Sequence, residues 1–571
     1  MKLINIPGFK ALFGDPQMTY DRLLEAMPSS NIIQQLAAIN SELYTPEEEG
    51  EKQRRLTEFI FSFFNDRQKA VFNQSFQQYR QLNPEWDGYF WLRPYLLTML
   101  AKECSVNRPG KPEYAGGNFT YNFVLAYLLV VDEVNERAKI DDTIDVSDPL
   151  AAYKHLWPFL VDQYEYNQAD NGPFGLFKLT AFSSHALKKL RPYLKEYLQQ
   201  FYYPNLSHLL SGYYQLANST LNYDTEQQLR KLTYLNPKPG VITSHLNSLT
   251  INSMLGKPTT IQEIKKFPVF KTSQGTYMVI DEAMLNRKIY NGPYFDLIKT
   301  TSLRNVQSYE TYSTRISKDV LEDICFRSIC AHLKKSAHDC LKFDNNEQSL
   351  PDCYYRNNKK TLFIEFKDYF FPERLVTDGK FEKIKEYIDQ RFVNNEKGKP
   401  KGITQLLNNI ERLAGGTYTF DKKGSDWISE GKKLTVYPIL SFSDFMFTLP
   451  AVNQYLNEML NSKLDRLQYP QLEIKPMTMI SLETLFDLSY RGKDFILLTE
   501  LIDQYHQLLR EKKKLFTKNA STDIYLQSVM SFDEVYNSRF IKKYLGQINS
   551  RKVFSIADVV ELSKEQMEET L

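Results

Sequence analysis

Three ionisable residues are spaced as a hydrolytic site would need them within residues 349–371, which read SLPDCYYRNNKKTLFIEFKDYFF. Asp352 precedes a polar turn, and Glu365 and Lys367 interrupt the apolar run that follows the turn. Side chains two apart on a strand point to the same face, so this run predicts that Glu365 and Lys367 lie side by side. An apolar strand with both charges on one face indicates that those charges do chemical work.

An antiparallel hairpin would bring Asp352 to the same place. With residues 357–360 as a four-residue loop, Arg356 faces Thr361, and the same register places Asp352 opposite Glu365. Directly opposed residues have Cβ atoms about 5 Å apart. The hairpin therefore predicts that three ionisable groups converge beside the apolar segment LFIEF.

This convergence favours a divalent metal ion. Two neighbouring carboxylates repel each other, and a cation held between Asp352 and Glu365 removes that repulsion. Oxygen ligands suit Mg²⁺, with Mn²⁺ as a substitute. Such an ion lowers the pKa of a bound water and polarises a phosphoryl oxygen, while Lys367 orients the water or stabilises the developing charge.

The pair Pro351-Asp352, followed later by Glu365-Phe366-Lys367, resembles the motif of the PD-(D/E)XK nuclease superfamily. The order of elements over residues 316–444 is also similar to the core of that family: a leading helix, a hairpin with the acids, helices and another strand. The resemblance implies Mg²⁺-dependent hydrolysis of phosphodiester bonds. In it, Asp352 and Glu365 are metal ligands and Lys367 is catalytic.

The same resemblance implies two further site residues. Members of the family often have a Glu on the leading helix that joins the metal ligands, and Glu322 in KDVLEDICF holds a suitable place. Relatives also often carry a Gln on the helix after the third strand, where GITQLLNNI offers Gln405. The implied catalytic set therefore includes Gln405, and the implied metal ligands include Glu322.

Other interpretations of the hairpin stay open. An edge hairpin would carry Glu365 and Lys367 on a solvated face, and an inactive nuclease-like fold would serve as a scaffold that binds nucleic acid or protein. An RNA-processing nuclease with the same residues is a further alternative. Against the solvated edge, TLFIEFKDYFF is apolar at most places, as expected of a strand covered on both faces.

The elements that must position these residues predict a mixed α+β and α/β protein, mainly helical, with an embedded αβββαβ core like that of restriction endonucleases. Apolar residues recur at helical spacing up to about residue 255. We expect a helical N-terminal region for recognition or partner binding, a small connector with a β-hairpin, the nuclease-like core and a helical C-terminal region. Their ranges are 1–255, 256–310, 311–450 and 451–571.

Composition and charge limit the kinds of partner, metal site and location that we expect for this chain. A net charge of +2 over 571 residues gives no general attraction to nucleic acid or membranes. Lys and Arg do outnumber Asp and Glu between residues 352 and 434, which would supply a local basic surface. The five cysteines contain no CxxC pair and predict free thiols rather than a zinc site. No apolar run is long enough to cross a bilayer, and the first residues lack an apolar signal segment, which predicts a cytoplasmic protein.

These features together predict a metal-dependent endonuclease, with DNA favoured over RNA as its substrate. Large helical proteins with such a core resemble bacterial restriction or antiphage defence effectors. The expected partners are nucleic acid and either a partner subunit or a second copy of the chain, and no membrane.

Overall fold

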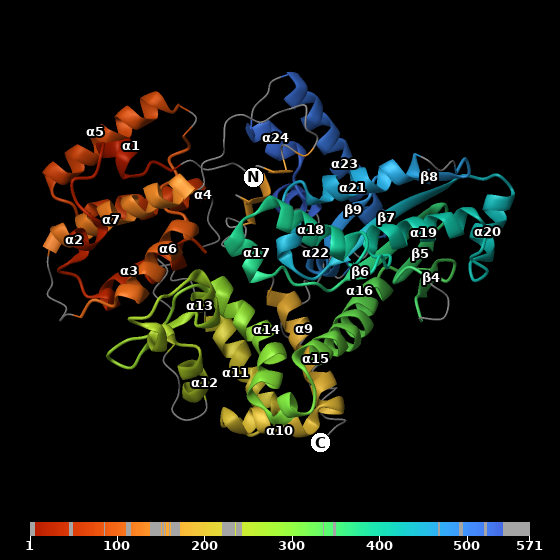
Figure 1. Cartoon of the computed structure of the whole chain (residues 1–571), viewed down its shortest axis with the longest axis horizontal. Coiled ribbons are helices and arrows are strands. Elements are labelled where there is room, and N and C mark those ends of the chain that lie inside the picture. Colours follow the sequence, from red (N-terminus) through yellow and green to blue (C-terminus); the bar gives the residue numbers. More distant parts are fainter. Residues whose placement is uncertain are drawn as a thin grey trace. The chain divides into compact units, whose positions relative to one another are not determined.

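A computed structural model of the chain describes residues 6–44, 49–84, 86–109, 116–137, 150, 153–154, 156–158, 160–161, 172–219, 234–235, 242–334, 336–345, 350–465, 469–489, 495–518 and 522–540. The described residues form two compact units (Figure 1). The six-stranded unit lies within Asp141–Lys189 and Gln307–Leu571, and the three-stranded unit lies within Leu3–Ile140 and Leu190–Val306.

The three-stranded unit is mainly helical. Its helices are α1 (Phe9–Phe13), α2 (Tyr20–Leu24), α3 (Ser29–Glu42), α4 (Glu49–Ser62), α5 (Asp66–Leu82), α6 (Arg93–Val106), α7 (Gly116–Arg137), α10 (Arg191–Gln200), α11 (Leu206–Ser219), α12 (Ile242–Ser248), α13 (Ile261–Lys266) and α14 (Glu282–Thr300), with 3-10 turns at η1 (Ile251–Met254) and η2 (Ser302–Asn305). Its small sheet has the order β1 (Tyr234–Leu235), β3 (Tyr277–Val279), β2 (Val269–Lys271), all antiparallel. The predicted hairpin is therefore present, with Gly275 at a positive φ of 80° in its turn.

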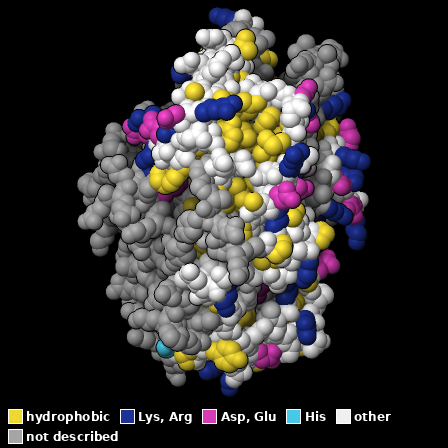
Figure 2. Space-filling view, turned by 90° about the vertical axis from the view of Figure 1, so that its left-hand side faces the viewer, with side chains coloured by type: hydrophobic (Ala, Val, Ile, Leu, Met, Phe, Trp, Pro, Cys, Tyr) yellow, Lys and Arg dark blue, Asp and Glu magenta, His cyan; other side chains and the backbone are white. Residues whose placement is uncertain are grey.

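Hydrophobic side chains gather in a patch on the face of the molecule drawn in Figure 2. Among the described residues, helices α4 and α5 expose large apolar side chains at Phe59, Phe63, Val71 and Leu82. Contiguous exposed apolar surface is common at protein-binding sites. The recognition or partner-binding role of the N-terminal region stays a prediction.

The six-stranded unit is built around one mixed sheet. Its strands are β4 (Cys340–Phe343), β5 (Cys353–Asn357), β6 (Lys360–Lys367), β7 (Leu434–Phe442), β8 (Leu472–Ile474) and β9 (Thr478–Ser481). Strands β4, β5 and β6 are antiparallel neighbours, β7 runs parallel to β6, and both β8 and β9 pair with β7 in parallel. The mixed, mainly helical fold class is thus confirmed.

Helices precede the sheet, connect its parallel strands and follow it. They are α9 (Gly172–Lys189), α15 (Tyr309–Ile316), the π-helical segment η3 (Ser317–Phe326), α16 (Arg327–Ala331), α17 (Glu373–Asp378), α18 (Phe381–Phe392), α19 (Gly402–Ala414), α20 (Lys422–Ser429), η4 (Phe445–Thr448), α21 (Val452–Leu464), α22 (Leu482–Asp487), α23 (Phe495–Lys518), α24 (Thr522–Ser528), α25 (Phe532–Val535) and η6 (Tyr536–Phe540). None of the helices in the described ranges has the length and apolar character needed to cross a membrane.

The compact units do not coincide with the four predicted ranges. Helix α9, from the predicted N-terminal region, packs against η3 and α22 in the six-stranded unit. The predicted connector 256–310 supplies two of the three strands of the other sheet instead of standing apart. The boundary at residue 450 lies inside the larger sheet, because β8 and β9 follow it and pair with β7. Residues 541–571 of the predicted C-terminal region lie outside the described residues.

A buried ion pair fastens β5 to α20 in the six-stranded unit. The guanidinium of Arg356 donates through Nη2 to Asp421 Oδ1 at 2.6 Å and through Nε to Oδ2, and both side chains are 3% exposed. Tyr354 also donates to this carboxylate. Burial alone would raise the pKa of Asp421, but the hydrogen bonds from Arg356 and Tyr354 hold it below its ordinary value.

We expect Asp421→Asn to lower the free energy of unfolding by about 3 kcal/mol at neutral pH, because it leaves the Arg356 charge buried without a counterion. A depressed folded-state pKa contributes stability that is present above the unfolded-state pKa and lost as the pH falls through the folded-state pKa. The difference between variant and wild type should therefore shrink in acid. Urea unfolding at a series of pH values measures this difference.

The matched control is Glu430→Gln, which removes an exposed pair with Lys432. It should change the free energy of unfolding by less than about 1 kcal/mol. Equal effects of the two substitutions would contradict the role assigned to the buried pair.

Candidate functional site

The hairpin of β5 and β6 has the predicted register. Arg356 pairs with Thr361 and Cys353 pairs with Ile364, so the next position places Asp352 beside Glu365. The turn is shorter than predicted, because Asn357 and Lys360 themselves pair and leave two residues between them. The first of these two, Asn358, takes a positive φ of 49°, which asparagine tolerates better than most residues.

The ammonium group of Lys367 lies between the two carboxylates. Its Nζ is 3.3 Å from Asp352 Oδ2 and 3.2 Å from Glu365 Oε2, and it donates to the carbonyl oxygen of Phe366 at 3.0 Å. The backbone N–H of Phe366 also donates to Asp352 Oδ2 at 2.7 Å. The structure therefore brings together the three residues that the motif singled out.

The interpretation of β6 as a solvated edge is wrong. Strand β6 lies between β5 and β7, and Glu365 is 1% exposed while Lys367 is 9% exposed. Helix α19 packs on β6, and on the opposite face of the strand the ring of Phe366 stacks on Phe326 of η3 with centroids 5.0 Å apart. The two charges are thus enclosed between helices on a central strand.

Burial and charge together shift the pKa values of this cluster. Burial raises the pKa of Glu365 well above its ordinary value, the charge of Asp352 raises it further, and Lys367 opposes both. Burial alone would lower the pKa of Lys367, but the charges of Asp352 and Glu365 outweigh it and raise the pKa. Lys367 therefore keeps its proton at neutral pH.

Sequence reasoning missed Asn409 on α19. Its Nδ2 donates to Glu365 Oε1 at 3.1 Å, and Tyr418 donates to Asn409 Oδ1 at 2.7 Å, which fixes the amide. Asn409 follows the predicted Gln405 by one helical turn, and residues so spaced share a helix face. That spacing is a signal from which Asn409 could have been found.

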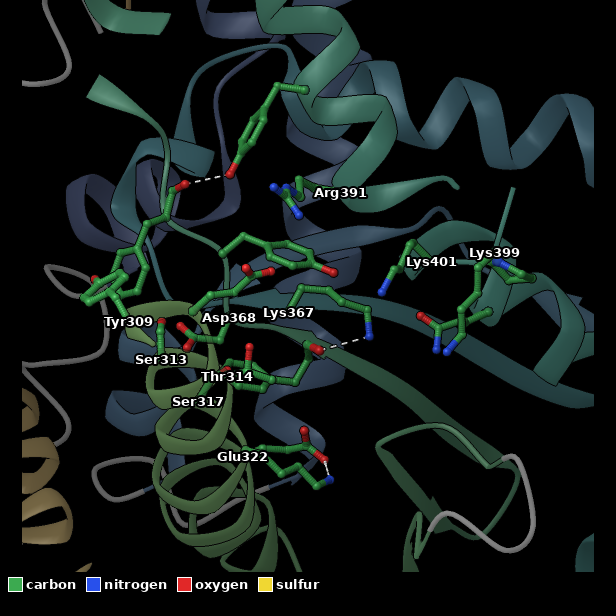
Figure 3. Close-up of a pocket in the computed structure, with 18 residues that line it drawn as sticks. Tyr309, Ser313, Thr314, Ser317, Glu322, Lys367, Asp368, Arg391, Lys399 and Lys401 are labelled. Atoms are coloured by element: carbon green, nitrogen blue, oxygen red, sulfur yellow. Dashed lines mark hydrogen bonds and ion pairs between the residues drawn. The ribbon is translucent and has the colours of Figure 1, made fainter. Parts of the chain in front are cut away.

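Gln405 itself lies in a cavity next to Lys367. Its Oε1 is buried and has no hydrogen-bond partner among the described residues. The cavity has a volume of about 660 Å³ and is bounded by α15, η3, the end of β6, α18 and the start of α19 (Figure 3). Of the five predicted residues, Glu322, Lys367 and Gln405 line this cavity, while Asp352 and Glu365 do not.

Glu322 of η3 forms an ion pair with Lys318 on the same segment. Burial raises the pKa of Glu322 above its ordinary value, Lys318 opposes this shift, and the charge of Asp352 adds to it. The predicted third acid therefore lies near enough to Asp352 to interact with its charge.

The oxygen atoms around Lys367 are of the kind that bind a hard cation. Asp352 Oδ2, Glu365 Oε2 and Phe366 O all lie within 3.3 Å of the ammonium nitrogen, and Mg²⁺ prefers such oxygen ligands. Within the described ranges, no group of three or more His, Cys, Asp or Glu side chains is arranged to hold a metal ion. Asp352 and Glu365 both contact Lys367, and Glu322 is paired with Lys318.

In metal-free protein, we expect Asp352→Asn to lower the pKa of Glu365, because the Asp352 charge contributes to its rise. Lys367→Met should raise the pKa of Glu365 above its value in wild type, since the ammonium favours the ionised carboxylate. Carbon-13 NMR of the glutamate carboxyl groups during a pH titration measures both shifts. As a control, Asp378→Asn removes a carboxylate that pairs with Lys383 and should leave the pKa of Glu365 unchanged.

The raised pKa of Glu365 also predicts how stability depends on pH. A group whose folded-state pKa is raised contributes stability that is fully present below its unfolded-state pKa and lost as the pH rises through its folded-state pKa. Asp352→Asn narrows the gap between the folded-state and unfolded-state pKa values of Glu365. The variant should therefore lose less stability than wild type as the pH rises between these two values. Urea unfolding measures the loss, and identical pH profiles for the two proteins would contradict the assigned coupling.

Comparisons with other proteins bear on what this arrangement does. No family model, no curated protein and no solved structure matches the chain. A function is therefore inferred from the residues of the site and from their geometry.

Proposed function

We propose that the chain is a metal-dependent nuclease that hydrolyses phosphodiester bonds. Its catalytic site consists of Asp352, Glu365 and Lys367. The observation that carries this proposal is the Lys367 ammonium, which lies between two carboxylates at the edge of a cavity. In this proposal the two acids would hold a metal ion and the protonated lysine would stabilise the charge that develops on the phosphate, as metal-assisted hydrolysis uses them.

The order of elements supports the same proposal. A leading helical segment, three antiparallel strands, helices and a strand parallel to the third follow one another from Tyr309 to Phe442. This αβββαβ order is that expected from the resemblance to the PD-(D/E)XK superfamily. On the grounds of that resemblance, we propose a restriction-endonuclease-like core, DNA in preference to RNA as substrate, and a role in the cytoplasm in restriction or antiphage defence, alone or with a partner subunit.

In the proposed reaction, Asp352 and Glu365 would hold Mg²⁺, with Glu322 as a third ligand once released from Lys318. Bound Mg²⁺ would polarise a phosphoryl oxygen and lower the pKa of water. Lys367 keeps its proton at neutral pH, so it would donate hydrogen bonds to the phosphate and stabilise the negative charge that develops there. Asn409 holds Glu365 in place, and Gln405 would donate to the phosphate from the cavity wall.

A non-enzymatic scaffold is the second candidate. The observation that favours it is that Lys367 already forms ion pairs with both acids, as a purely structural ion cluster would. A scaffold would bind nucleic acid and leave it intact, whereas a nuclease would cleave it. Cleavage therefore separates the two candidates directly.

We expect wild-type protein with Mg²⁺ to nick or linearise plasmid DNA, and EDTA to abolish this activity. Asp352→Asn and Lys367→Met should each lower the rate at least about 100-fold, because each removes a charge that the reaction uses. Lys360→Met is the matched control on the same strand, since Lys360 bonds to Thr499 away from the acids and should not be needed for cleavage.

Circular dichroism of each variant shows whether it has folded. Undiminished cleavage by folded Asp352→Asn would refute the assignment of the site. Binding of DNA by wild type without cleavage in Mg²⁺ or Mn²⁺ would favour the scaffold. Parallel digestion of structured RNA tests the preference for DNA.

A further inference from the structure

One wall of the cavity beside Lys367 carries positive charge. Arg391 of α18, together with Lys399 and Lys401 from the turn before α19, points into the same space as Lys367 (Figure 3). The turn is fixed by backbone bonds, from Lys401 N to Val393 O at 2.9 Å and from Asn395 N to Lys399 O at 3.0 Å. These lysines are therefore held at the cavity by the backbone conformation of the turn.

Arg391 is positioned by two aromatic rings. Its guanidinium lies 5.0 Å from the ring centres of both Tyr369 and Tyr387. Its Nε is buried and has no hydrogen-bond partner among the described residues, and the same is true of Gln405 Oε1. Buried polar atoms left unsatisfied in a cavity are costly, and a ligand with acceptor and donor groups would satisfy both.

Exposed aromatic side chains also line the cavity. Tyr309 at the start of α15 is 47% exposed, and Phe370 after β6 is 43% exposed. The hydroxyl of Tyr387 donates to the backbone oxygen of Phe370 at 2.6 Å and so fixes the segment that bears it. Aromatic faces beside cationic side chains suit a ligand that has both a planar ring system and phosphate groups.

We infer that this cavity binds one unpaired nucleotide of the substrate strand, with its phosphates at Arg391, Lys399 and Lys401 and its base against Tyr309 and Phe370. The inference rests on the proposed function and names its substrate class: single-stranded or locally unpaired nucleic acid. A volume of about 660 Å³ is within the range of sites that enclose a small ligand. A base in a duplex stays stacked and would have to leave the helix to enter such a cavity.

Binding can be measured apart from cleavage. The full chain carrying Asp352→Asn, in EDTA, is titrated against fluorescent oligothymidylate of about 15 nucleotides and against the matching duplex, with anisotropy as readout. We expect the single strand to bind at least about 10-fold more tightly than the duplex. Tyr309→Ala should weaken binding of the oligothymidylate about 10-fold, by loss of stacking, and leave binding of an abasic strand of the same length unchanged.

The charge of the wall is tested by a matched pair of variants. Lys401→Glu should weaken binding of both strands at least about 10-fold, whereas Lys397→Glu should have a smaller effect, because Lys397 is exposed on the same turn and does not line the cavity. If Arg391→Ala fails to fold, Arg391→Lys is used in its place. It keeps the positive charge and removes the planar guanidinium, so it tests the role of that group. Circular dichroism establishes folding for each.

Failure of this inference differs from failure of the proposed function. Equal affinity for single strand and duplex, or equal effects of Lys401→Glu and Lys397→Glu, would overturn the nucleotide site even if wild type cleaves DNA. Single-strand binding with the expected variant effects, but without cleavage in any metal, would support the nucleotide site and overturn the nuclease. Absence of any binding would overturn the nucleotide site.

Discussion

The Lys367 ammonium between Asp352 and Glu365 is the interaction on which the rest of the six-stranded unit depends. Two neighbouring carboxylates repel each other, and burial of Glu365 makes its ionised form still less favourable. Lys367 offsets this because it reaches both carboxylates and the Phe366 carbonyl at once. A buried ion cluster of this kind is weak evidence for stability, since well-packed apolar residues would serve as well.

The cluster constrains the architecture around it. Strand β6 must be central to enclose Glu365, so it needs β7 on its far side, and β7 comes from more than sixty residues later in the chain, after the α17–α20 crossover. Helix α19 within that crossover supplies Asn409, which Tyr418 holds against Glu365. The same helix begins at the turn that presents Lys401 to the cavity. One crossover connection therefore places β7 beside β6, orients the buried acid and forms the basic wall.

Local rules predicted the part of the site that lies within one hairpin. Two rules placed Asp352, Glu365 and Lys367 together: the alternation of side chains along a strand and the register of a hairpin. Both rules depend on neighbouring positions alone. The loop length was wrong, since Asn358 takes a left-handed conformation that allows a tighter turn. Asn409 was missed because a polar residue on an amphipathic helix looks the same whether it faces solvent or a buried acid.

Strands β8 and β9 are three and four residues long and carry little periodicity, so their membership of the sheet depends on β7. Packing of α9 in the six-stranded unit is likewise decided by tertiary contacts.

The placement of Lys367 bears on whether the cluster is catalytic or structural. A lysine that serves only to neutralise Asp352 and Glu365 has no need to reach a cavity, and full enclosure would strengthen its ion pairs. Lys367 instead lines the cavity, whereas Asp352 and Glu365 do not. In the proposed nuclease, the long side chain of Lys367 would turn from a carboxylate to a phosphate oxygen. A cation that took its place between the acids would compensate their charge as the ammonium left. Lys367 thus contacts both acids and also lines the cavity, a position that the proposed nuclease would use and the scaffold would not need.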